Sequence, residues 1–273
     1  MKFNSDNLNI HELAIEEPEK KSEVFFDFEK EITEEDWGEM EKNMQRLLDD
    51  ANYNNVPWVA MNMKIIRPDY EPKFDWRVMQ KITADINIQR ELGEWRDFFS
   101  LAMEMKFVDP NYNSSIAFPE LLGIKRELEK CKNKQNWDNF SAIAMQIKII
   151  DPINCSDFLG LDSNVWDSMF RSLKNYKDNN MWNEFVNQAT HMKVIDPKID
   201  LDISESDWDN IRKKINFERN LGRGISFSNL VARVKILAAE KLEVTDKGLE
   251  ITMPKQSVGL QRETPAIPEQ KQF

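Results

Sequence analysis

A lysine recurs along this chain at nearly constant spacing, each time near the end of an apolar stretch. Four of the five copies have a proline four residues later, as in Ala60-Met61-Asn62-Met63-Lys64-Ile65-Ile66-Arg67-Pro68. The lysines are Lys64, Lys106, Lys148, Lys193 and Lys235, so the steps between copies are 42, 42, 45 and 42 residues. Repetition with a period of this length is the signature of a tandem array of small structural units.

The residues that precede each lysine have helical spacing. Alanine lies four residues before the lysine in four copies, and an apolar residue lies immediately before it in all five. An apolar residue also lies eight positions before it: Val56, Phe98, Phe140, Phe185 and Phe227. Steps of three and four place these residues on one stripe of an α-helix. The proline then ends the helix, because the residue before a proline is driven out of the helical conformation.

A second helix is expected upstream of each of these. It opens near an aromatic residue, with Asp, Ser or Thr in several copies at the positions just before it. The aromatic residues are Trp37, Trp76, Phe118, Trp166 and Trp208. Hydroxyl and acidic groups there cap the first N–H groups of a helix and complement its dipole. Each unit is therefore predicted to consist of a helix, a polar turn, a second helix and a segment that ends the second helix.

A single helical hairpin cannot bury its apolar stripe, so neighbouring units must stack. The sequence predicts an all-α fold, a right-handed α-solenoid of about five helical-hairpin repeats. The predicted repeats span residues 31–70, 71–113, 114–158, 159–202 and 203–242. This design resembles the tetratricopeptide and HEAT class of helical-repeat proteins. The resemblance implies an elongated surface that binds peptides or proteins.

The two ends of the array differ from its middle. The fifth repeat has Leu221-Gly222-Arg223-Gly224 where the others have an aromatic residue, and it lacks the Asp-Pro stop, as expected of a terminal capping repeat. Residues 243–253 alternate apolar and polar around an Asp-Lys-Gly turn, which predicts a small β-hairpin. Residues 1–30 are expected to form an acidic flexible arm, and residues 254–273 a disordered tail.

Composition indicates a cytoplasmic protein. The chain has no apolar run long enough for a membrane span, no secretory signal, and only two cysteines, Cys131 and Cys155. The net charge is −11, and residues 1–50 hold most of this acidity. The acidity therefore belongs to the arm and the first repeat, which argues against a protein whose whole surface imitates nucleic acid.

Little in the sequence points to catalysis. The repeated lysine is interpreted as a helix-dipole partner whose stem covers apolar surface, although a row of five ammonium groups for an acidic ligand is the functional alternative. The recurrent tryptophans are expected in the core. His191 replaces an Asn, Glu or Gln of the other repeats and is expected to be exposed. No catalytic, cofactor or metal site is predicted, and no cofactor is expected.

Two segments are candidate partner sites. The first lies in the acidic arm, where Val24, Phe25, Phe26 and Phe28 could dock on a partner or cap the first repeat. The second runs from Ile211 to Lys235 and carries seven basic residues against Glu218 alone. Its candidate contact residues are Arg212, Lys213, Lys214, Arg219 and Arg223. A solvated polar face is the simpler interpretation of this charge.

These observations predict a non-catalytic scaffold or accessory subunit that binds other proteins through the repeat surface and its two ends. Two alternatives stay open. The basic fifth repeat, Arg212 to Lys235, suggests association with nucleic acid. The groove of the array could also hold an enzyme site, which would require a pocket with convergent polar groups.

Overall fold

The computed structural model describes residues 32–109, 111–112, 116–152, 159–245 and 248–253. The described part is mostly helical, with one small antiparallel sheet near its C-terminal end, so the predicted all-α repeat fold with a β-hairpin is confirmed. Five helical hairpins follow one another in these residues: α2 (Glu34–Asp49) with α3 (Val56–Ile66), α4 (Trp76–Leu92) with α5 (Trp95–Val108), α6 (Phe118–Asn133) with α7 (Trp137–Ile150), α9 (Ser163–Asp178) with α10 (Trp182–Ile195), and α11 (Glu205–Asn220) with α12 (Gly224–Leu237).

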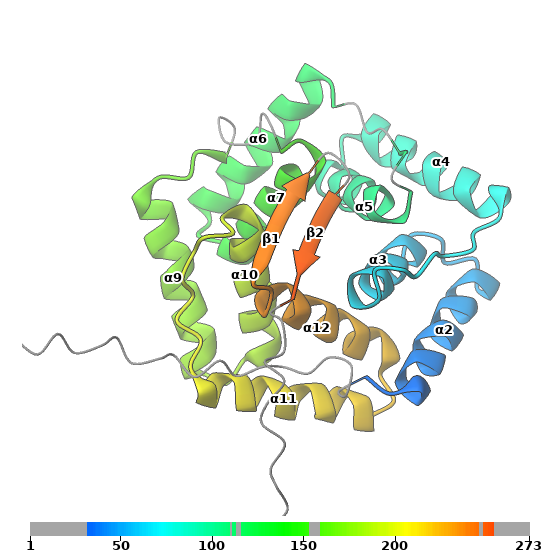
Figure 1. The fold of residues 1–273 in the computed structure, drawn as a ribbon. Coiled ribbons are helices and arrows are strands. Elements are labelled where there is room, and N and C mark those ends of the chain that lie inside the picture. The colour runs from blue at the N-terminus through cyan, green and yellow to red at the C-terminus, as the bar shows by residue number, and fades with distance from the viewer. Residues whose placement is uncertain (1–31, 110, 113–115, 153–158, 246–247, 254–273) are drawn as a thin grey trace, which may run out of the picture.

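The hairpins close into a ring, which the sequence did not predict. Helices α3, α5, α7, α10 and α12 form an inner circle in which each packs against the next, and α12 packs against α3 as closely as any other neighbouring pair. Helices α2, α4, α6, α9 and α11 form the outer circle (Figure 1). The array therefore has no free ends among the described helices, because its first and last hairpins are in contact.

Amphipathicity explains the two circles. The inner helices are buried over nearly their whole circumference, which is typical of a helix surrounded by other helices. Phe98, Phe140, Phe185 and Phe227, predicted as core, are all at most 2% exposed. The outer helices bury only one stripe, such as Val165, Met169 and Leu173 on α9. Their other side faces solvent and is mostly polar, with a few exposed apolar side chains such as Trp76.

Equivalent ion pairs link successive outer helices. A basic residue near the end of one helix meets an acidic residue in the first turn of the next, as in Arg90–Glu120 at 2.8 Å and Lys177–Asp207 at 2.5 Å. Arg219 at the end of α11 forms the same contact with Asp36 at the start of α2, at 2.9 Å. The ring is thus closed by the contact that joins its interior repeats.

A glycine marks the point of closure. Gly224 occupies the position where the first four repeats have Tyr53, Trp95, Trp137 and Trp182. A Cβ atom on Gly224 would lie 2.1 Å from the side-chain nitrogen of Asn43 on α2. The aromatic residue is missing from the fifth repeat because the first repeat packs against it, so this departure serves closure and not the capping of a free end.

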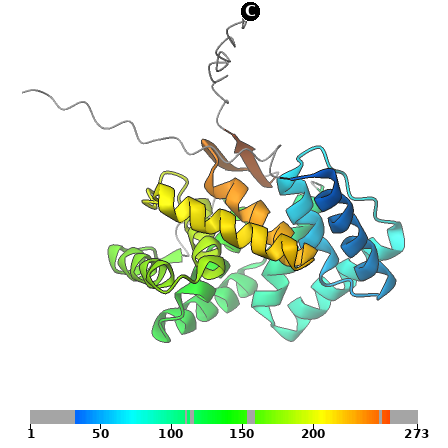
Figure 2. The ribbon, with the colours of Figure 1, turned by 90° about the horizontal axis from the view of Figure 1, so that it is seen from below.

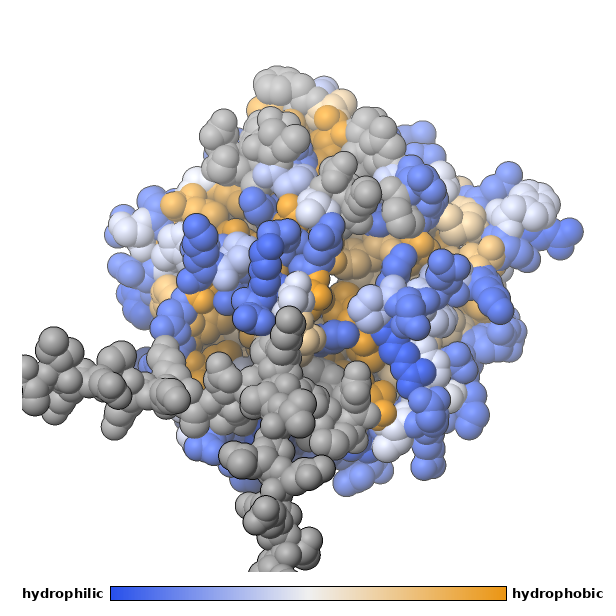
Figure 3. All heavy atoms as spheres, viewed as in Figure 1, coloured by the Kyte–Doolittle hydropathy of each residue, from blue (hydrophilic) through white to orange (hydrophobic). Residues whose placement is uncertain are grey.

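The predicted hairpin is present and lies on one face of the ring. Strand β1 (Lys241–Thr245) pairs with β2 (Gly248–Thr252) in antiparallel register, with Leu242 opposite Ile251. The strands contact α5 and α7, and Figure 2 shows that they stand to one side of the helical layer. In the space-filling view from this side, hydrophobic side chains gather at the centre of the ring, within a hydrophilic surround (Figure 3).

None of the helices in the described ranges is long and apolar enough to span a membrane.

Candidate functional site: a polar lumen

The five inner helices enclose a central cavity of about 450 Å³, which is called the lumen here. Every inner helix contributes to its wall, and Leu249 of β2 contributes from the hairpin side. The volume lies within the range of small-molecule sites. Such an enclosed space exists only because the ring is closed.

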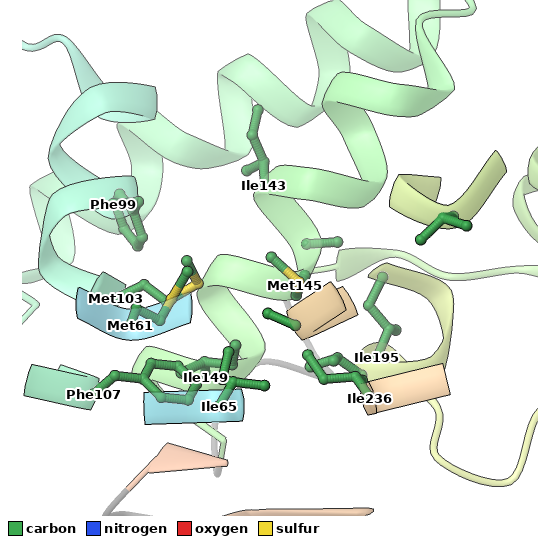
Figure 4. Packing of buried hydrophobic residues seen from close by; sticks show 14 of the residues in the cluster. Met61, Ile65, Phe99, Met103, Phe107, Ile143, Met145, Ile149, Ile195 and Ile236 are labelled. Atoms are coloured by element: carbon green, nitrogen blue, oxygen red, sulfur yellow. The ribbon is translucent and has the colours of Figure 1, made fainter. Parts of the chain in front are cut away.

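The hairpin end of the lumen is apolar. Its lining residues there follow each repeated lysine by one position: Ile65, Phe107, Ile149, Val194 and Ile236. All five are at most 8% exposed. Figure 4 shows Ile65, Phe107, Ile149 and Ile236 converging near the strands, with Met61, Met103 and Met145 in the adjacent layer. These side chains form an apolar floor.

The opposite end is open to solvent. Arg96, Asp97 and Glu184 lie in the first turns of α5 and α10, line the lumen and are exposed. The inner helices all begin at this end, so their N–H groups point toward the mouth and favour acidic residues in the first turn. Asp97 and Glu184 fit this structural role.

A layer of polar side chains lies between the mouth and the floor. Each inner helix supplies one, always two residues before the repeated lysine: Asn62, Glu104, Gln146, His191 and Arg233. The first four are buried and Arg233 is half-buried. The side-chain nitrogen of Asn62, Oε2 of Glu104 and Oε1 of Gln146 are buried without a hydrogen-bond partner among the described residues. This set is called the polar layer below.

Gln188 adds to the unsatisfied groups near the polar layer. It lies one turn before His191 on α10, lines the lumen and is 1% exposed. Within the part of the chain that the structure describes, neither its amide nitrogen nor its amide oxygen has a hydrogen-bond partner. Buried polar atoms in folded proteins are nearly always hydrogen-bonded, so a cluster of unsatisfied ones around one cavity marks a place where a ligand or ordered water is expected to bind.

Burial changes the ionisation of Glu104. Desolvation raises the pKa of this carboxyl to about 8, and the hydrogen bond from Ser100, with 2.9 Å between Ser100 Oγ and Glu104 Oε1, lowers it only in part. At neutral pH the side chain is therefore mostly the uncharged acid. Trp58, Ser100 and Glu104 also line a second cavity of about 400 Å³ beside α3 and α5. Glu104 thus borders both spaces.

His191 and Arg233 form a hydrogen-bonded pair. Arg233 Nη1 lies 2.9 Å from His191 Nε2, and His191 Nδ1 lies 3.1 Å from Ser141 Oγ. The Ser141 hydroxyl donates its hydrogen to the Asp138 carbonyl oxygen, so it must accept from Nδ1. The neutral tautomer with hydrogen on Nδ1 satisfies all three contacts. Desolvation, and then the Arg233 charge, hold the pKa of His191 well below its ordinary value.

Sequence reasoning placed His191 wrongly. It was expected to be exposed because its counterparts are polar, yet it is 7% exposed and faces the lumen. A polar residue at one register of every repeat is solvated in an open array but enclosed in a closed one. The recurrent polar position two residues before each lysine was therefore the signal of the site, and reading it required knowledge of the closure.

The repeated lysine has a structural role in at least two copies. Lys106 Nζ donates to the carbonyl oxygens of Ile149 and Ile150 at the end of α7, at 2.8 and 3.2 Å. Lys235 Nζ donates to the Ile66 carbonyl oxygen at the end of α3, at 2.7 Å. The structural interpretation is thus correct, but each ammonium group reaches the end of the next inner helix and not that of its own.

The recurrent tryptophans are not all core residues. Trp37 is 7% exposed, whereas Trp95, Trp137 and Trp182 are partly buried, with their rings edge-on to the buried phenylalanine three residues later. Trp76 is 65% exposed on α4, which contradicts its assignment to the core.

The predicted basic site consists mainly of ion pairs. Arg212 contacts Asp209, Lys214 contacts Glu218, Arg219 contacts Asp36, and Arg223 approaches Glu218 at 3.8 Å. Lys213 is exposed. Arg233 and Lys235, from the same segment, face the lumen and the end of α3. Contact of this surface with nucleic acid or protein stays a prediction. The candidates in the acidic arm, Val24, Phe25, Phe26 and Phe28, lie outside the described residues.

No family model, curated protein or solved structure matches this chain. The described residues also contain no cluster of three or more His, Cys, Asp or Glu side chains suited to a metal ion. Function is therefore argued from the lumen alone.

Proposed function

We propose that this protein binds a small polar molecule in the lumen of its helical ring. The observation that carries the proposal is the cluster of buried polar atoms without partners on Asn62, Glu104, Gln146 and Gln188, all lining one cavity. A buried polar atom that lacks a hydrogen-bond partner costs about 1–3 kcal/mol of desolvation, and a ligand that hydrogen-bonds to these atoms removes that cost.

The shape of the lumen suits such a ligand. Its open mouth gives a path from solvent, and its apolar floor excludes water from the far side of a bound molecule. A small molecule is favoured over a macromolecule because the polar layer lies about 10 Å along the helix axis from the first-turn residues at the mouth. A protein surface would have to insert a narrow peptide to reach it.

Trp58 gives a direct test, because it lines the lumen. The protein is labelled with fluorotryptophan, and the Trp58 resonance is assigned with Trp58→Phe. The low-molecular-weight fraction of a host extract is expected to shift this resonance. Trp76, on α4 and outside the lumen, is the matched control and should not move. If only the macromolecular fraction binds and Trp58 is unaffected, the proposal fails.

Binding to other proteins is the second candidate. The observation that favours it is the set of large apolar side chains exposed on the outer helices, among them Trp76, Leu92, Phe217 and Leu221. The closure of the ring removes the two free ends on which this prediction relied, so a partner would have to use the outer surface. Loss of a co-purified protein on Trp76→Ser, with the Trp58 resonance unchanged by the small-molecule fraction, would favour this candidate.

Catalysis in the lumen is an extension of the first proposal. Glu104 is buried, faces the ligand space and has a pKa of about 8, which suits a group that donates a proton at neutral pH. If bound ligand is turned over, Glu104→Gln should abolish turnover and retain binding. Turnover that survives Glu104→Gln would remove Glu104 from that role.

A further inference from the structure

We infer that the molecule bound in the lumen is an organic anion whose carboxylate or phosphate group contacts Arg233. This inference rests on the proposed function and adds the chemical class of the ligand. It starts from the hydrogen bonds that Arg233 makes within the ring, and from the charges that the polar layer lacks.

The side chains of the described residues that hold Arg233 in place are neutral. Its Nε donates to the Asn229 side-chain oxygen at 3.0 Å, and its Nη1 donates to His191 Nε2 at 2.9 Å. The guanidinium forms no ion pair with a carboxylate of the described residues, and no described residue accepts a hydrogen bond from Nη2. A half-buried guanidinium without a counter-ion is costly, and a carboxylate or phosphate is the partner that its planar donor edge fits best.

The rest of the polar layer does not neutralise this charge. Asn62 and Gln146 are amides, and His191 is neutral in the hydrogen-bonded arrangement described above. Glu104 is the one carboxyl in the layer, and its burial keeps it mostly protonated. The polar layer therefore has a net positive charge at neutral pH. The carboxylates of Asp97 and Glu184 are exposed at the mouth, where solvent screens them.

Further donors lie at the same cavity. The side-chain nitrogens of Asn62 and Gln188 are buried, and no described residue accepts a hydrogen bond from them. Asn62 is on α3 and Gln188 is on α10, the two inner helices that flank α12 and therefore Arg233. An anion at Arg233 would thus have neutral N–H donors on either side. A cationic ligand at the same place would instead meet the charge of the Arg233 guanidinium.

Matched probes test the sign of the ligand charge. Glutarate, glutaramide and cadaverine have the same carbon chain, with acid, amide and amine ends, and inorganic phosphate tests the other anion. Binding to the full chain is measured at neutral pH by calorimetry and by the Trp58 fluorine resonance. The variants are Arg233→Gln, Arg233→Lys as the conservative change, and Arg223→Gln as an exposed control with the same substitution.

The expected result is binding of glutarate, phosphate or both, with glutaramide and cadaverine at least about 10-fold weaker. Arg233→Gln should weaken the anion about 10-fold or more, Arg233→Lys should retain part of the affinity, and Arg223→Gln should change nothing. Glutarate alone would assign carboxylates, and phosphate alone would assign phosphates. Circular dichroism melting of Arg233→Gln separates loss of binding from loss of folding.

Three results would overturn the inference. One is glutaramide or cadaverine binding as tightly as the anions. Another is equal affinity of the wild type and Arg233→Gln for an anion that shifts Trp58. The third is no response to either anion at about 10 mM. In each case the proposed function survives if the host small-molecule fraction still shifts Trp58, and it fails as well if that fraction does not.

Discussion

Lys235 Nζ donates a 2.7 Å hydrogen bond to the carbonyl oxygen of Ile66, 169 positions earlier in the chain. The same contact joins Lys106 to Ile149, between neighbouring repeats in the interior of the array. The fifth repeat therefore contacts the first repeat in the same way that an interior repeat contacts the repeat that follows it. The recurring lysine forms the same hydrogen bond between adjacent repeats and between the last repeat and the first, and in the second case it helps to close the ring.

Removal of the hydrogen bond from Lys235 to Ile66 should destabilise the ring measurably. We expect Lys235→Met to lower the free energy of unfolding by about 1.5–3 kcal/mol, because a charged hydrogen bond is lost and a buried carbonyl is left unsatisfied. Chemical denaturation measures the change. Lys213→Met, at an exposed site on α11, is the matched control and should be close to neutral. Equal losses in the two variants would show that the Lys235 contact contributes nothing.

A Cβ atom at position 224 should destabilise the protein. We expect Gly224→Ala to cost about 1–3 kcal/mol, because the new methyl group would overlap the Asn43 side chain, which is held by its hydrogen bond to the Glu39 carbonyl. Asn43→Ala should restore part of the loss in the double variant. Gly38→Ala is the control, since its Cβ would meet no atom within 4 Å and alanine favours the helix. Thermal melting of the four variants gives the comparison, and a stabilising Gly224→Ala would argue against this packing.

Lys235 and Gly224 illustrate which features of the fold can be predicted from the sequence. The spacing of Lys64 to Lys235 predicts the number of hairpins and the approximate limits of each helix, because hydrophobic periodicity is local. It does not predict closure, which depends on the small rotation between successive repeats, accumulated over the whole array. The sequence shows that Gly224 departs from the repeat pattern. The reason for the departure, close packing against Asn43, is seen only in the structure.

The lumen was missed for the same reason. The polar position that precedes each lysine by two residues is plain in the sequence, from Asn62 to Arg233, but in an open array it reads as a solvated edge. The pairing of His191 with Arg233 and the protonation of Glu104 follow from enclosure. Enclosure is a property of the tertiary fold.

Protonation of Glu104 should make the stability of the protein depend on pH. The folded-state pKa is about 8 against an ordinary value of 4.5, so the folded state binds more protons between these values and stability falls as pH rises. The depressed pKa of His191 acts in the opposite direction below its ordinary 6.5. In the window between pH 6.5 and about 8 the contribution of Glu104 is therefore the larger of the two.

Within that window we expect the free energy of unfolding to fall by at most about 1 kcal/mol per pH unit, because Glu104 begins to ionise in the folded state and His191 is still partly protonated in the unfolded state. Glu104→Gln should remove this slope and reveal a loss of stability below pH 6.5 from protonation of His191 in the unfolded state. Urea denaturation at several pH values measures both effects. A wild-type protein with constant stability across the window would mean that Glu104 is ionised in the folded state.

Two neighbouring aromatic residues of α7 should differ in their contribution to stability. Phe140 is 2% exposed in the first turn of α7, so Phe140→Ala should cost about 3–5 kcal/mol. Trp137 is only partly buried, with its ring edge-on to Phe140 at 5.7 Å between centroids, so Trp137→Ala should cost less despite the larger side chain. Denaturation midpoints rank the two, and the reverse order would mean that Trp137 is the principal core residue of this repeat.

Closure of the ring is the claim on which the lumen and its ligand depend. The most direct measurement is the distance between spin labels at Glu35 on α2 and Asn220 on α11, two exposed positions next to the Asp36–Arg219 ion pair. In pulsed electron–electron double resonance, the closed ring predicts a single narrow distribution centred on a short distance between the labels, independent of protein concentration. A long or broad distribution would show that the first and last repeats are apart in solution, and would contradict both the ring and the site within it.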